Sequence, residues 1–350
     1  MTPTDGGLPL AALQSWLQHK VMPFDGPLQV TPLTGGQSNP TYRVSAGPHR
    51  WVLRRKPPGV LLASAHAIER EYRVMRALAG SDVPVPRMHA LCEDASVIGS
   101  PFYVMDFVEG RVFSDPSLPG LAPQERGAIY DAMNGVIAAL HSVDLQAAGL
   151  NDYGRPSNYL GRQIERWTRQ YRASQSDGDG GRIEAMERLI EWLPAHRPQD
   201  AESDETALVH GDFRIDNLIF HPTEPRVLAV LDWELSTLGH PLVDLAYHVM
   251  AWRVTPAEFR GLKGHDLQAL GIPLEPEYLA AYGRRTGRAA LPHWDYYLAF
   301  NMFRMAAILQ GIRARALQGS AASADGASTG RQAHPMAEAG WRQVQQMLAA

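Results

Sequence analysis

The stretch LVHGDFRIDNLIF, from Leu208 to Phe220, decides how this chain of 350 residues is interpreted. Its two ends are short apolar runs, which are typical of strands. Between them lies a polar loop with four residues of chemical interest, His210, Gly211, Asp212 and Asn217. Further along, the apolar run VLAVL (227–231) leads directly into Asp232. The pattern therefore predicts one carboxylate in a loop between strands and another at the end of a strand.

These residue types suit phosphoryl transfer. The reaction needs a carboxylate that accepts the proton of the attacking hydroxyl, and oxygen ligands that hold Mg²⁺ against the phosphates. Asp212 is the predicted catalytic base, and Asn217 and Asp232 are the predicted magnesium ligands, because Mg²⁺ prefers oxygen donors. The order of the segments matches the catalytic and metal-binding loops of protein kinases. The structural alternative is an Asp that caps a turn and an Asn that binds its own loop.

The rest of the chain predicts an α+β, protein-kinase-like fold of two lobes. Strand-like runs at 28–33, 41–46, 50–55, 87–93 and 101–110 and one helix at 62–79 predict a small β-rich lobe. Helical patterns then follow at 123–143, 158–172, 182–193, 242–252, 275–285, 292–317 and 336–348. We expect a nucleotide-binding lobe over 1–107. A helical lobe over 108–350 should carry the catalytic loop, the metal loop and the acceptor site.

The β-rich lobe offers candidate contacts for nucleotide phosphates. The loop TGGQSNPTY (34–42) can turn backbone amides toward phosphate oxygens through Gly35, Gly36, Gln37, Ser38 and Asn39. A glycine pair also suits an ordinary hairpin. In the next strand, alternation places Val52 and Arg54 on one face. Arg54 falls where kinases carry the lysine of the strand motif V-A-I-K, and Val52 should line the same cleft.

The helix at 62–79 should supply an acidic partner for Arg54. Its predicted apolar stripe consists of Ile68, Tyr72, Met75 and Ala79. Glu71 lies at the edge of this stripe, whereas Glu69 lies on the polar side with Arg73 as its i+4 partner. We therefore predict an ion pair between Arg54 and Glu71. The alternative is that Glu71 is a plain surface residue.

The run PFYVMDFVEG (101–110) is the predicted hinge between the lobes. Backbone groups at Asp106 and Val108 could bind the edge of an adenine, and Met105 would line the base pocket. Any edge strand has unpaired backbone groups, so this pattern also fits an ordinary edge strand. We expect Mg²⁺–ATP to bind in a cleft between residues 33–110 and 207–235.

Together these segments resemble the aminoglycoside phosphotransferase and choline-kinase-like family of small-molecule kinases. The resemblance runs from about Leu33 to Trp252 with the motifs in family order. It implies a catalytic base at Asp212, magnesium ligands at Asn217 and Asp232, and a supporting acidic residue at Asp244. The segments TGGQSNPTY, VLRRKPPG, HGDFRIDN and LDWELSTLGHPLVDLAY look most like the kinase domain fused to some acyl-CoA dehydrogenases. Arg54 replaces the usual lysine, which puts catalytic efficiency in question.

Composition limits the partners. The chain has 33 basic and 37 acidic residues, a net charge of −4, so neither nucleic acid nor a membrane surface is expected as a partner. A single cysteine, Cys92, and the lack of an export signal or long apolar run predict a cytoplasmic protein. A homodimer is one of the assemblies left open.

The predicted acceptor is a small molecule with a hydroxyl group, neutral or anionic in charge. Residues 241–350 hold 11 basic against 8 acidic residues, which does not suit a polycation. Arg304, Arg313 and Arg315 could bind a carboxylate or a coenzyme A phosphate, or could simply be solvated. The resemblance favours a hydroxy acid or hydroxyacyl-CoA.

Three alternatives remain. The chain could be a pseudokinase that binds nucleotide without turnover, supported by Arg54, or a true aminoglycoside-type kinase. A hydrolase with Asp212, Asp216 and Asn217 as metal ligands is the third, but it requires further ligands that the sequence does not supply in order.

Overall fold

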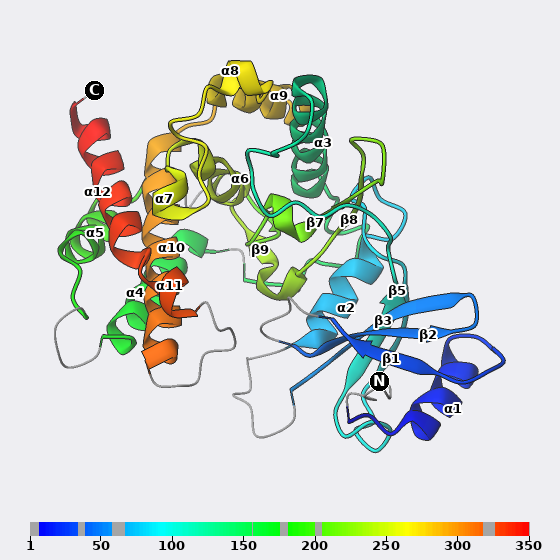
Figure 1. Ribbon diagram of the computed structural model, residues 1–350. Coiled ribbons are helices and arrows are strands. Elements are labelled where there is room, and N and C mark those ends of the chain that lie inside the picture. Colours follow the sequence, from blue (N-terminus) through cyan, green and yellow to red (C-terminus); the bar gives the residue numbers. More distant parts are fainter. Residues whose placement is uncertain are drawn as a thin grey trace. The chain divides into compact units, whose positions relative to one another are not determined.

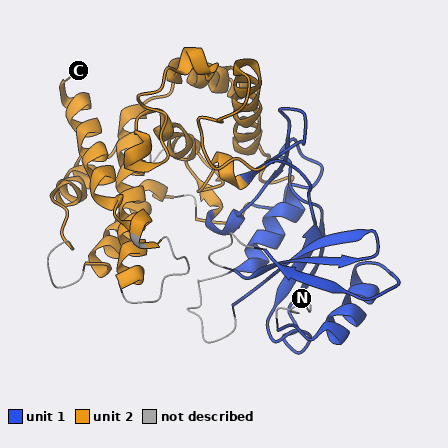
Figure 2. Cartoon of the chain, viewed as in Figure 1, with its two compact units in different colours: residues 1–111, 148–150, 218–235 blue, residues 112–147, 151–217, 236–350 orange. Residues whose placement is uncertain are grey.

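The computed structural model describes residues 7–33, 39–57, 67–155, 157–175, 181–199, 205–317 and 326–349. These residues form two compact units (Figure 2). Unit 1 comprises residues 1–111, 148–150 and 218–235, and unit 2 comprises 112–147, 151–217 and 236–350. The first boundary therefore follows Arg111, four residues after the expected one. Unit 1 also takes in two later segments that the simple division at residue 107 assigned to the helical lobe.

Unit 1 is built on one antiparallel five-stranded sheet with the order β1-β2-β3-β5-β4 (Figure 1). Its strands are β1 (Gln29–Pro32), β2 (Thr41–Ala46), β3 (His49–Arg55), β4 (Met88–Cys92) and β5 (Phe102–Asp106). All five lie within the runs expected from the sequence or within one residue of them. Strand β3 lies at the centre, where Val52 pairs with Arg43 of β2 and Met105 of β5.

The two faces of the sheet carry different elements. Helix α1 (Leu10–Lys20) buries Leu13 and Leu17 in one apolar core with Trp51 and Leu53 of β3. Val52 and Arg54 alternate with those two residues and lie outside this core, as the pleat of a strand requires. Helix α2 (Ile68–Ala77) packs against β4 and β5.

Two details of α2 correct the sequence prediction. Residues 58–66 lie outside the described residues, and the described helix begins at Ile68. Ala79 is exposed and Leu78 is buried in its place, because the last predicted position falls beyond the helix end. Glu69 forms its ion pair with Lys56 rather than with Arg73, whose Nη2 donates to the Gly149 carbonyl.

A short hairpin also belongs to unit 1. Strands β7 (Leu218–Phe220) and β8 (Val227–Val230) are antiparallel, and Leu218 pairs with Val230. The Val230 amide donates to the Pro84 carbonyl, 2.8 Å away. The turn η3 (Trp233–Leu235) follows β8 and packs against α2. The hairpin therefore brings Asp232 and Glu234 to the same unit as Arg54.

Unit 2 is mainly helical, with α10 (Trp294–Leu317) at its centre. Helix α10 contacts α4, α5, α6, α11 and α12, and its residues from Tyr296 to Ala307 are all buried. The other helices are α3 (Pro123–His141), α4 (Tyr159–Ala173), α5 (Glu184–Ala195), α6 (Pro241–Val249), α7 (Pro256–Phe259), α8 (Leu267–Leu270), α9 (Glu275–Thr286), α11 (Gly326–Gly330) and α12 (Ala333–Ala349). Among the described residues, none of the helices is long and apolar enough to cross a membrane.

The catalytic loop lies in unit 2. It follows β6 (Ala207–Val209), which pairs with β9 (Thr237–Gly239), and it ends in the turn η2 (Ile215–Asn217). Strand β6 also contacts α3 and α6. The loop therefore starts from a fully buried strand that helices hold in place.

Candidate active site

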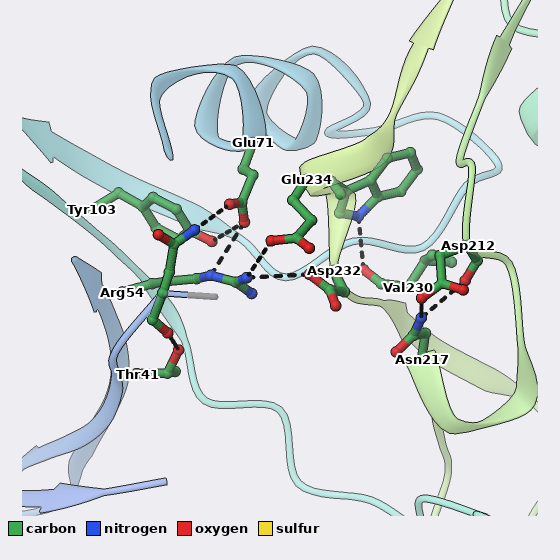
Figure 3. A network of polar contacts seen from close by, with 11 residues as sticks. Thr41, Arg54, Glu71, Tyr103, Asp212, Asn217, Val230, Asp232 and Glu234 are labelled. Atoms are coloured by element: carbon green, nitrogen blue, oxygen red, sulfur yellow. Dashed lines mark hydrogen bonds and ion pairs between the residues drawn. The ribbon is translucent and has the colours of Figure 1, made fainter. Parts of the chain in front are cut away.

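Arg54 lies at the centre of a charged network in unit 1 (Figure 3). Its guanidinium is an ion-pair partner of three carboxylates: Nε is 3.4 Å from Glu71, and Nη2 is 3.1 Å from Asp232 and 3.7 Å from Glu234. The ion pair expected between Arg54 and Glu71 is thus present. Burial alone would lower the pKa of Arg54, but the three carboxylates outweigh it and raise that pKa.

Glu71 is almost completely buried, at 1% exposure. Its carboxylate accepts hydrogen bonds from the Asn39 amide and the Tyr103 hydroxyl, both 3.1 Å away. Burial raises the pKa of Glu71 to about 7, although the charge of Arg54 acts in the opposite direction. A carboxylate with this pKa is partly protonated at neutral pH, so its pairing with Arg54 depends on pH.

Asp232 has a backbone conformation that most residues avoid, with φ of +63°. Left-handed backbone at a residue other than glycine is uncommon, and such strain gathers at functional sites. Its carboxylate is 36% exposed, so one side faces Arg54 while the rest remains accessible. Glu234, two residues later, adds a carboxylate that the sequence analysis did not single out.

In unit 2, the carboxylate of Asp212 is held on both oxygens. Oδ1 accepts a short hydrogen bond from the Tyr247 hydroxyl and lies 3.2 Å from Nε of Arg214. Oδ2 accepts a hydrogen bond of 3.1 Å from Nδ2 of Asn217, which also donates to the Asp212 carbonyl (Figure 3). Burial and the nearby Asp212 carboxylate raise the pKa of Tyr247, which keeps its hydroxyl protonated as a donor.

Asp244 of α6 binds the backbone of the loop that carries Asp212. Its two oxygens each accept a backbone N–H at 2.8 Å, from His210 and from Gly211. Gly211 has φ of +82°, a conformation that glycine adopts without strain. Burial would raise the pKa of Asp244, but hydrogen bonds and the charge of His141 lower it, so the group stays ionised. The structure thus gives Asp244 a physical role in shaping the loop.

The remaining predicted nucleotide contacts are only partly described. Gly35, Gly36, Gln37 and Ser38 lie outside the described residues. Met105 lies beside Val52 in the sheet, and both side chains are buried.

The hinge segment offers fewer backbone donors than expected. The N–H of Asp106 donates to the Arg87 carbonyl at 2.9 Å, so this donor is already engaged. Its side chain binds His89. Val108 follows the strand and is half-buried.

A pocket in unit 2 opens beside the catalytic loop. The space inside it that a water-sized sphere can reach is about 50 Å³. Its walls are mostly apolar and aromatic, with Tyr130, Met133, Ile215, Tyr247, Met250, Trp252, Val254 and Phe259 among them. The charged residues in its lining are Arg214, Asp216 and Arg260, and His248 also lines it. Asp216 already forms ion pairs with both arginines.

Comparison with known proteins identifies the family. The model of a phosphotransferase enzyme family matches residues 29–300, which include Arg54, Asp212 and Asp232. The chain belongs to this family. A solved structure from Ralstonia eutropha JMP134, described as a candidate aminoglycoside phosphotransferase, is 55% identical with a TM-score of 0.87, covering 97% of this chain and 99% of that one. This family's fold supports ATP-dependent phosphotransfer to a small molecule.

Two further relatives define the limits of this likeness. Acyl-CoA dehydrogenase family member 10 of Mus musculus is 49% identical over 95% of this chain and 31% of that protein. The chain spans less than half the length of the curated relatives it matches. A thermostable mutant of the aminoglycoside phosphotransferase APH(4)-Ia, solved with AMP-PNP and hygromycin B, shares the fold with a TM-score of 0.59 at 17% identity, over 94% and 98% of the two chains.

Several residues of the site were not found from the sequence. Tyr247 lies on α6, far along the chain from Asp212, and only the tertiary fold brings its hydroxyl to that carboxylate. Arg304 was named from the sequence as a possible acceptor contact, but its hydrogen bond to the Gly211 carbonyl was not expected. Glu234 had a local signal, since it is two residues from Asp232 in the run LDWE.

Proposed function

We propose that this protein transfers the γ-phosphoryl group of ATP to a hydroxyl of a small neutral or anionic molecule. The observation that carries the proposal is the arrangement of Asp212. Its carboxylate is fixed by Tyr247 and Asn217 next to an open apolar pocket. A fixed carboxylate beside a pocket that an acceptor can approach is what a general base for a hydroxyl requires.

The donor atoms in the structure suit a nucleotide and Mg²⁺. Nε of Arg54 faces Glu71, whereas its Nη2 lies near the partly exposed carboxylates of Asp232 and Glu234, where a phosphate oxygen could compete with them. Because Nδ2 of Asn217 is committed to Asp212, its Oδ1 is left as an oxygen ligand. Asp232 supplies a partly exposed carboxylate. When bound, Mg²⁺ would offset the charge of the β- and γ-phosphates.

The proposed reaction is a direct displacement. The acceptor oxygen forms a bond to the γ-phosphorus while Asp212 accepts the hydroxyl proton. The bond from the γ-phosphorus to the β–γ bridging oxygen breaks, and ADP leaves with that oxygen. Arg54 stabilises the phosphate charge, and Tyr247 and Asn217 keep Asp212 aligned.

The pocket favours a neutral or anionic acceptor. A polycationic aminoglycoside would require several available carboxylates. Asp216 is the carboxylate in the pocket lining, and Arg214 and Arg260 already neutralise it. Together with the resemblance to kinase domains fused to acyl-CoA dehydrogenases, this supports a hydroxy acid or hydroxyacyl-CoA as the acceptor.

The test compares Asp212→Asn with the wild type in two assays. We expect Mg²⁺–ATP binding by calorimetry to change little, and the rate of transfer to fall by about 10²–10⁴-fold. The acceptor assay should include hydroxy acids, hydroxyacyl-CoA thioesters and kanamycin. A loss of rate below about tenfold would contradict the role of Asp212. ATP binding without turnover on any acceptor would favour the pseudokinase, and efficient turnover of kanamycin alone would favour the antibiotic kinase.

A further inference from the structure

A second cationic group lies next to the catalytic loop in unit 2. Arg304 of α10 is 5% exposed, and its Nη2 donates a hydrogen bond to the carbonyl of Gly211, the residue before the proposed base. Its Cζ lies 4.7 Å from the centre of the Tyr247 ring, and the Tyr247 hydroxyl binds Asp212. Arg304 therefore contacts both the backbone and the side chain that position the base.

This supporting role leaves part of Arg304 unsatisfied. Its Nε is buried and has no hydrogen-bond partner within the described part of the chain. Over the same residues, no carboxylate forms an ion pair with it. A buried guanidinium normally has a counter-ion and satisfied donors, because its desolvation is otherwise unfavourable. An anion bound beside Arg304 would supply the missing hydrogen-bond acceptor and the missing counter-charge.

Arg166 of α4 supplies a second cation beside the Trp167 ring, which Arg304 also approaches. Its Cζ lies 5.0 Å from the centre of the Trp167 ring, and the Cζ of Arg304 lies 5.4 Å from the centre of that same ring. Partial burial and the nearby charge of Arg304 both lower the pKa of Arg166. Arg166 is exposed to solvent, so a ligand can reach it. Like Arg304, Arg166 forms no ion pair with a carboxylate among the described residues.

We propose that Arg166 and Arg304 form a binding site for an oxyanion of the acceptor, a carboxylate or a phosphate. The assignment to the acceptor rests on the proposed function, because the site adjoins the loop that carries Asp212. Two guanidinium groups near one another repel until an anion binds, and each can donate to its oxygen atoms. The site would anchor the charged end of the acceptor while its hydroxyl meets Asp212.

The site is tested on the nucleotide-free full chain, so that the result does not depend on turnover. The indole N–H of Trp167, which donates to Gln163, is followed by ¹⁵N–¹H NMR during titration with sodium phosphate and, separately, sodium acetate at constant ionic strength. Its resonance is assigned with Trp167→Phe. The variant is Arg166→Gln, and the matched control is Arg169→Gln, which removes an exposed arginine from the same helix.

We expect a saturable shift of the Trp167 resonance in the wild type and in Arg169→Gln. In Arg166→Gln the dissociation constant should rise by about tenfold or more, because a charge-assisted hydrogen bond is lost. A response to acetate alone identifies a carboxylate site, and a response to phosphate alone identifies a phosphate site. No saturable shift with either anion, or equal affinity in Arg166→Gln, would overturn the proposal. Failure of the proposed function would appear separately, as a wild-type protein without ATP turnover.

Discussion

Replacing Arg54 with methionine should make the stability of unit 1 depend strongly on pH. The change keeps the length of the side chain but removes the cation that Glu71, Asp232 and Glu234 share. Glu71 would keep its hydrogen bonds from Asn39 and Tyr103 but lose Arg54, its ion-pair partner among the described residues. Removing one partner of a buried ion pair typically costs about 3–5 kcal/mol.

The sign of the pH dependence follows from the pKa of Glu71. Its folded pKa of about 7 already exceeds the ordinary glutamate pKa of 4.5, so this group favours the folded state most at low pH. The favourable contribution is lost as pH rises through the folded pKa. Without Arg54, the folded pKa of Glu71 rises further. For each unit by which that pKa rises, the variant's free energy of unfolding falls about 1.4 kcal/mol further below the wild-type value, once the pH exceeds the raised pKa.

The assay is urea unfolding followed by circular dichroism at pH 6 and pH 9, in buffer with EDTA. We expect Arg54→Met to be destabilised more at pH 9 than at pH 6, by roughly 2–3 kcal/mol if the pKa of Glu71 rises by about two units. The double variant Arg54→Met/Glu71→Gln should lose this pH-dependent part, and Arg54→Lys should fall between wild type and Arg54→Met. An equal cost at both pH values, or an unchanged pH dependence in the double variant, would refute the reasoning.

Three other predictions concern unit 2. Tyr247→Phe should lower kcat by about 10- to 100-fold with little effect on ATP binding, because the Asp212 carboxylate loses a hydrogen bond. Steady-state kinetics check this against the control Tyr296→Phe, since the hydroxyl of Tyr296 donates to the Leu193 carbonyl instead. Asp244→Asn should destabilise the protein by about 3 kcal/mol in urea unfolding, since one amide oxygen cannot accept both loop N–H groups; an unchanged midpoint would exclude this role. Burial lowers the pKa of His248 from 6.5 to about 4, so stability should be full above pH 6.5 and fall by up to about 3 kcal/mol toward pH 4; His248→Asn should reduce this loss, as measured by unfolding at both pH values.

The main elements could be predicted from the sequence because their signals are local. The alternation of β3 predicted that Val52 and Arg54 share one face, and in the structure both lie outside the core that contains Trp51 and Leu53. Helical spacing was also sufficient to choose Glu71 over Glu69 as the partner of Arg54. Both inferences depend only on the periods of a strand and a helix, which tertiary packing left unchanged here.

Contacts between distant segments could not be predicted in this way. Arg304 reaches the Gly211 carbonyl across 93 residues of sequence, and Tyr247 reaches Asp212 across 35. The prediction that Glu69 pairs with Arg73 was wrong for a related reason. The i+4 rule describes an isolated helix, whereas Lys56 from the end of β3 competes successfully for the same carboxylate.

The residue at position 54 links the fold to the proposed chemistry. A lysine ammonium is a compact charge, whereas the planar guanidinium of Arg54 spans Glu71 through Nε and both Asp232 and Glu234 through Nη2. Arginine can therefore hold α2, β3 and the segment after β8 together within unit 1. In the proposed function, Mg²⁺ and phosphate compete for Asp232 and for Arg54. The same contacts that stabilise this unit would then set how readily it accepts a nucleotide.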